Sequence, residues 1–103
     1  MAANPEILAE GQLPNAKGTL FTATGRTIIR LITAAHVAGG TQTVVFYVKK
    51  TASTSRVLGR AVLLTNEFAE EDQVVTLDTG DLIEGETTNA LSVDYTIMGV
   101  KTT

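Results

Sequence analysis

The sequence predicts an all-β fold: an antiparallel β-sandwich, jelly-roll-like or Ig-like, with six to seven strands and an extended N-terminal arm. Segments rich in Val, Ile and Thr are separated by turn residues about every ten positions, which is typical of sandwiches. Residues 91–101 alternate between apolar and polar, as a half-buried strand does. No window carries an apolar stripe of helical period and helical length, so helices are not expected.

Length and composition restrict the class of protein further. A chain of 103 residues is a single-domain length, and 44% hydrophobic with 18% charged residues predicts a folded chain. The net charge of −3 and the scattered basic residues argue against a nucleic-acid partner. The absence of cysteine excludes disulfides and thiolate sites. No apolar run is long enough to span a membrane and no signal peptide is apparent, so we expect folding in a cytoplasm.

The individual strands follow from apolar runs bounded by turn residues. The expected strands cover 19–22, 26–38, 41–50, 56–65, 73–79, a short piece of 82–89, and 91–101. Gly39-Gly40 is a strong turn signal, so strands 26–38 and 41–50 are expected to pair as a hairpin. Gly59 predicts a bulge or a close backbone approach. Residues 66–72 (NEFAEED) are expected to form a loop.

The first 17 residues are predicted to be an arm, and residues 18–103 the sandwich domain. The arm contains Ile7, Leu8 and Leu13 without periodicity, and Pro5 and Pro14 favour extended conformations. Such a segment either lies along its own sandwich or docks on a neighbour by strand addition, and docking is the interpretation adopted. Deletion of residues 2–15 is then expected to leave the domain folded and to abolish docking.

Strand 26–38 is apolar on both faces, which suggests that a neighbour covers its outer face. One face would carry Ile28, Ile32 and Ala34, and the other Ile29, Leu31 and Val37. Together with the arm, this strand supplies the predicted interface residues: Ile7, Leu8, Leu13, Pro14, Ile28, Ile32 and His36.

The sequence contains no recognisable catalytic or metal-binding constellation. His36 is the only histidine and has no partner at a defined spacing. The acidic run Glu67, Glu70, Glu71 and Asp72 lacks the pattern of a calcium loop, so a solvated rim is the favoured interpretation. Tyr47 and Tyr95 are expected to pack in the core. We therefore expect neither an enzyme nor a cofactor.

Three stretches resemble a family of small structural proteins encoded by tailed phages and prophages. They are LAEGQLPNAKGTLFTA, TVVFYVKK and GDLIEGETTNALSVDYTIMGVK, corresponding to an LAxGQLP-like start, a GTLYT-like first strand, a TVxLYVxR-like strand and a GDxIEG…AxDYxIxG-like finish. The resemblance covers nearly the whole chain from Leu8. Two segments depart from it: TATGRT is short where relatives carry a Pro-Ala-Gly turn, and NEFAEED replaces an Ala-Gly turn.

The resemblance implies a capsid decoration (cement) protein. Such a protein would bind the major capsid protein of a tailed phage as a homotrimer, on the capsid surface of a virion assembled in the host cytoplasm. The arm would clasp a neighbour, and the closed oligomer would add several weak contacts into high avidity. The alternatives are a tail, neck or baseplate protein, and a receptor- or carbohydrate-binding module, for which Phe68 is the one suitable aromatic residue.

Overall fold

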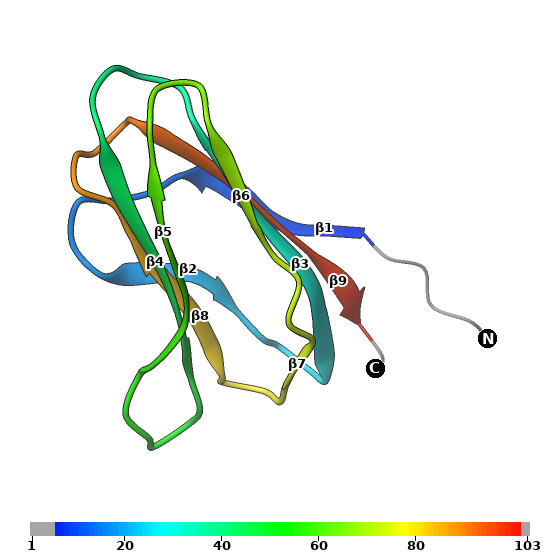
Figure 1. Ribbon diagram of the computed structural model, residues 1–103. Coiled ribbons are helices and arrows are strands. Elements are labelled where there is room, and N and C mark those ends of the chain that lie inside the picture. The colour runs from blue at the N-terminus through cyan, green and yellow to red at the C-terminus, as the bar shows by residue number, and fades with distance from the viewer. Residues whose placement is uncertain (1–5, 102–103) are drawn as a thin grey trace.

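The computed structural model describes residues 6–101, which form nine strands in two antiparallel sheets. The five-stranded sheet has the order β1 (Glu6–Gln12), β9 (Val93–Lys101), β3 (Thr27–His36) and β6 (Phe68–Glu71), with β7 (Val75–Leu77) also paired to β3. The four-stranded sheet has the order β2 (Gly18–Thr22), β8 (Leu82–Glu86), β4 (Gln42–Lys49) and β5 (Arg56–Leu63). Figure 1 shows the two layers. The predicted all-β sandwich is confirmed. Within residues 6–101 no helix is long and apolar enough to cross a membrane.

The core lies between the sheets and is built by alternation along the strands. In β9, Val93, Tyr95 and Ile97 are buried and alternate with more exposed residues, as predicted from the sequence. In β4, Val44 and Phe46 face them from the other sheet. Removing such side chains from water contributes about 1.5–3 kcal/mol each, so these alternating strands are the main source of stability.

A β-bulge in β3 determines which of its apolar residues face the core and which face outward. The pairing of β3 with β9 shifts between Ile29 and Leu31, which inserts one extra residue. Ile29 and Ile32 are therefore both fully buried, although they are three positions apart. Ile28 and Leu31 lie on the outer face, opposite Val100 and Met98. The predicted grouping of Ile28 with Ile32 is wrong, because strict alternation does not continue through the bulge.

The predicted hairpin of strands 26–38 and 41–50 is also wrong. β3 pairs with β9, β6 and β7, whereas β4 pairs with β5 and β8 in the other sheet. The Gly39-Gly40 loop thus crosses between the layers, and Gly40 adopts a positive φ of 87°. Because both flanking strands bury one face, they satisfy those faces by packing across the core rather than side by side.

Two strands were not expected from the sequence. Residues 6–12 form β1, the edge strand beside β9, and Leu13 is 1% exposed in the core. This part of the predicted arm therefore packs on its own chain. Residues 1–5 lie outside the described range. Residues 68–71 of the expected loop form β6, which pairs with β3 at Ala34↔Ala69. The sequence of β6 is acidic and does not look like a strand, because Ala69 is the one small apolar residue that it turns towards the core.

Candidate functional site

The predicted interface residues fall into two groups in the structure. Leu13, Ile32 and His36 are at most 2% exposed, so they belong to the interior and are not available to a neighbour. This corrects their assignment, because the bulge in β3 and the packing of β1 turn them inward. The others reach the surface to different degrees: Ile7 is 57% exposed, and Leu8, Pro14 and Ile28 are half-buried.

His36 has a local structural task. Its Nδ1 accepts a hydrogen bond from the Ala38 amide at 3.2 Å, and its Nε2 lies 2.5 Å from the carbonyl oxygen of Gly40. Since Nδ1 accepts, Nε2 carries the proton and donates to that carbonyl. The ring therefore closes the crossing loop between the sheets, and both nitrogens are occupied. The buried Gln42 fixes the far end of this loop, where its Oε1 accepts from Thr87 and Asn89.

The two outer faces of the sandwich differ in character. On the five-stranded sheet, Ile7, Met98 and Leu31 stand opposite one another in a row across β1, β9 and β3. We define the outer apolar face by the members of this row and the neighbouring pair: Ile7, Ile28, Leu31, Met98 and Val100. Residues directly opposite in an antiparallel pair have Cβ atoms about 4.5–5.5 Å apart, so this face is continuous.

The outer face of the four-stranded sheet is mostly polar, although Val57 and Val62 of β5 are 57% and 61% exposed on it. Tyr47 lies there and not in the core, with the Nζ of Lys17 4.9 Å from the centre of its ring. Partial burial and the neighbouring Glu86 raise the pKa of the Tyr47 hydroxyl above its usual 10.0. Tyr95, by contrast, packs in the core as predicted. The outer apolar face differs from this polar face because large apolar side chains stand opposite one another there across three adjacent strands.

A slot opens into the side of the sandwich between β5 and β6. These two edge strands belong to different sheets, and the short turn between them brings them side by side (Figure 1). Val44 and Phe46 of β4 line the inner end of the slot, while Gly59, Ala61 and Ala69 line its walls. The cavity volume is about 50 Å³. Small wall residues leave this space, because larger side chains at these positions would fill it.

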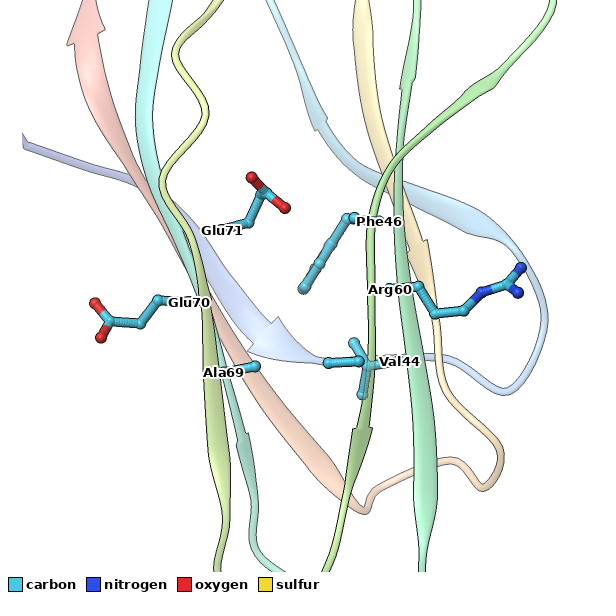
Figure 2. Close-up of a pocket in the computed structure, with 8 residues that line it drawn as sticks. Val44, Phe46, Arg60, Ala69, Glu70 and Glu71 are labelled. Carbon is cyan, nitrogen blue, oxygen red and sulfur yellow. The ribbon is translucent and has the colours of Figure 1, made fainter.

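The acidic run divides between three different environments. The Glu67 carboxylate accepts from the Leu64 amide at 2.6 Å and closes the turn between β5 and β6. Glu70 and Glu71 are adjacent in β6 and point to opposite sides: in Figure 2, Glu70 points away from the slot and Glu71 points into it. The predicted solvated rim therefore describes Glu70, whereas Glu71 is half-buried on the core side.

Glu71 occupies the space that Gly59 leaves open. A Cβ at position 59 would meet the Glu71 carboxylate, so a larger residue there would displace that side chain. The predicted bulge lies at this position, since the pairing of β5 with β4 shifts between Gly59 and Val57. One carboxylate oxygen accepts from the Gln73 amide at 3.2 Å. None of the ion pairs recorded within residues 6–101 involves Glu71. Arg60, although it lines the slot, points away from it (Figure 2).

At the opposite end of the sandwich, Asp81 is a buried structural carboxylate. It accepts from the Asp78 and Thr51 amides at 2.9 and 2.8 Å, and from the Lys50 ammonium at 3.2 Å. These bonds, led by the one from Asp78, lower the pKa of Asp81 from 3.8 to about 2 and outweigh the opposing effect of burial. Asp81 thus ties the β4–β5 loop to the turn before β8. In the described part of the chain no three His, Asp or Glu residues gather as a metal group.

Comparison with known proteins relates the chain to others through its structure. No family model matches the sequence, and no curated protein gives a significant match. A chain of the Bacillus endospore appendages, described as disulfide-linked pili, aligns with a TM-score of 0.54 and 15% identity over 99% of this chain and 87% of that one. The likeness is one of fold.

Two structures of infectious bursal disease virus share the same architecture. One, of the T13 viral particle, aligns with a TM-score of 0.57 at 9% identity over 97% of this chain and 31% of that one. The other, of the Gx strain, aligns with a TM-score of 0.52 at 13% identity over 97% and 33%. The chain spans about a third of these viral chains. The β-sandwich of this protein is therefore one that occurs in virus particles and in pili.

Proposed function

We propose that this protein is a capsid decoration protein that binds the assembled head of a tailed phage as a homo-oligomer, with a trimer as the expected form. The observation that carries the proposal is the outer apolar face, where Ile7 is 57% exposed and Ile28, Leu31 and Met98 are half-buried beside the buried Val100. The sequence resemblance to phage structural proteins supports the same role. The occurrence of this sandwich in virus particles is compatible with it.

In this proposal the outer apolar face is the contact between copies. Leu31 and Met98 stand at its centre, and Ile7 extends it to the β1 edge. A closed oligomer would bury this face and present several identical head-binding surfaces, so that weak contacts add up. Binding only to the assembled lattice would then stabilise the head by mass action.

A second candidate function is a subunit of a tail or another appendage. The alignment to the endospore appendage chain covers most of both chains, which favours stacking of this sandwich into a filament. This chain has no cysteine, so any such assembly would be non-covalent, unlike the disulfide-linked pili. A receptor-binding role is less favoured, because Phe68, although 68% exposed, stands without a second exposed aromatic residue beside it in β6.

The test is binding of the purified protein to phage heads that lack it. We expect the protein to cosediment with heads at saturating stoichiometry and to raise their temperature of disruption. Leu31→Asp should weaken binding and oligomer formation together, while Thr43→Asp, on the polar outer face, should do neither. Binding to tails or self-assembly into filaments instead would support the second candidate.

A further inference from the structure

We infer that the slot between β5 and β6 receives a lysine side chain from the bound partner, with its ammonium on Glu71 and its methylene stem against Phe46 and Val44. This inference deepens the proposed function, because the lysine would belong to the capsid protein on which the sandwich sits. It nevertheless concerns a site that the isolated chain already contains.

The shape of the slot fits an unbranched chain. Its volume of about 50 Å³ is several times the roughly 10–15 Å³ that admits one water molecule. Its walls are Gly59, Ala61 and Ala69, and the apolar side chains of β4 close it inside. A space of this volume suits a row of methylene groups better than the planar fork of an arginine.

The charge of the slot selects a cation. Glu71 faces the core side of β6, where a carboxylate loses hydration and gains from an opposite charge. Within residues 6–101, the hydrogen bond from the Gln73 amide engages one of its two oxygens. The basic residue that lines the slot, Arg60, directs its guanidinium outward (Figure 2). The cation that complements Glu71 would therefore come from outside the chain.

The competing explanation is that Glu71 is a guard against edge-to-edge aggregation. An inward-pointing charge on an edge strand prevents another strand from pairing there. This explanation accounts for the charge and for Gly59, which leaves room for the inward carboxylate, but not for Ala61 and Ala69, which leave the rest of the slot open. The two explanations predict different behaviour of Glu71→Gln.

The test uses n-butylammonium as the probe and the isolated full-length protein as the sample. We expect saturable shifts of the amide resonances of Gly59, Ala61 and Ala69 on titration, and much smaller shifts with n-butanol at the same concentrations. Glu71→Gln should weaken n-butylammonium binding about tenfold, because it removes the charge and keeps the shape. Glu70→Gln is the matched control, since it makes the same change of charge one residue away on the other side of β6.

The outcomes separate the inference from the proposed function. Equal binding of the probe by wild type and Glu71→Gln, or no saturable shifts, would overturn the inference even if the protein binds heads. Self-association of Glu71→Gln with no probe binding by wild type would establish the guard explanation. Probe binding without head binding would leave the slot as a lysine site and refute the proposed function. Head binding that Glu71→Gln weakens and Glu70→Gln does not would support both.

Discussion

At the scale of single residues, most polar groups with unusual surroundings hold loops in place. Asp81 is the strongest case, because two segments far apart in the sequence, at Lys50-Thr51 and at Asp78, donate hydrogen bonds to one buried carboxylate. Its lowered pKa means that the folded state favours the ionised form more than the unfolded state does. Its contribution to stability is therefore complete above about pH 4 and is lost as the pH falls through 3.8 towards 2.

The Asp81 prediction is tested by Asp81→Asn. We expect a loss of about 2 kcal/mol in the free energy of unfolding at pH 7, because the bonds to the charged carboxylate are weakened. The difference from wild type should shrink as the pH falls from 4 to 2, and urea denaturation across this range measures it. Asp78→Asn is the control: its pair with Arg26 is exposed, so the loss should be below about 0.5 kcal/mol. Equal losses for both variants would contradict the assignment.

A second prediction at the scale of residues compares Leu13 and Ile7, two apolar side chains of similar size in the N-terminal segment. Leu13→Ala should cost about 3 kcal/mol of stability, because Leu13 is fully buried and the change leaves a cavity. Ile7→Ala should cost less than about 0.5 kcal/mol, since this side chain is 57% exposed. Thermal unfolding of the two variants distinguishes them. A small loss of stability for Leu13→Ala would mean that Leu13 does not pack in the core and belongs to an arm that does not contact the domain.

At the scale of elements, the presence of β1 changes the result expected when the N-terminal arm is deleted. Deletion of residues 2–15 would take away β1 and Leu13 and expose the edge of β9. We therefore expect the truncated chain to be strongly destabilised and prone to aggregate, not folded as the sequence suggested. Circular dichroism and size-exclusion chromatography of the truncated chain measure this. A stable truncated monomer would show that β1 contributes little.

The elements also show what sequence patterns convey and what they omit. The alternation in 91–101 and the turn residues Asp78–Asp81 predicted a strand and a turn, and the structure confirms the turn and a strand that begins at Val93. Leu91 lies before this strand and is 71% exposed. The bulge in β3 could not be predicted from the sequence, because one extra residue does not change the pattern of a run that is apolar on both faces. β6 was missed because its residues, FAEE, show no alternation of apolar and polar side chains, and only pairing with β3 makes it a strand.

The slot shows the same limit for the candidate site. The sequence predicted a bulge or a close backbone approach at Gly59, and the bulge is present, but Glu71, whose side chain lies against Gly59, belongs to a different sheet. Two edge strands meet there only because the chain crosses from one layer to the other between them. Local pattern carries no information on which sheet a strand joins, so this site could be found only from the fold.

At the scale of the whole molecule, the row of apolar side chains across the outer face of the five-stranded sheet predicts self-association. Leu31→Asp should convert the oligomer to monomer, because it places a charge in the centre of the outer apolar face. Sedimentation velocity measures the mass of each species, and Thr43→Asp on the polar face should leave it unchanged. A wild-type protein that is monomeric at high concentration would contradict the proposal that the outer apolar face is the contact between copies.

The central claim is that the protein belongs to the capsid lattice of a phage. The most direct test is its copy number in purified virions, measured by quantitative mass spectrometry against the major capsid protein. We expect a ratio near one to one or a simple fraction of it, because a decoration protein follows the symmetry of the lattice. A handful of copies per particle, or none, would contradict the claim; a handful would move the protein to the tail or neck.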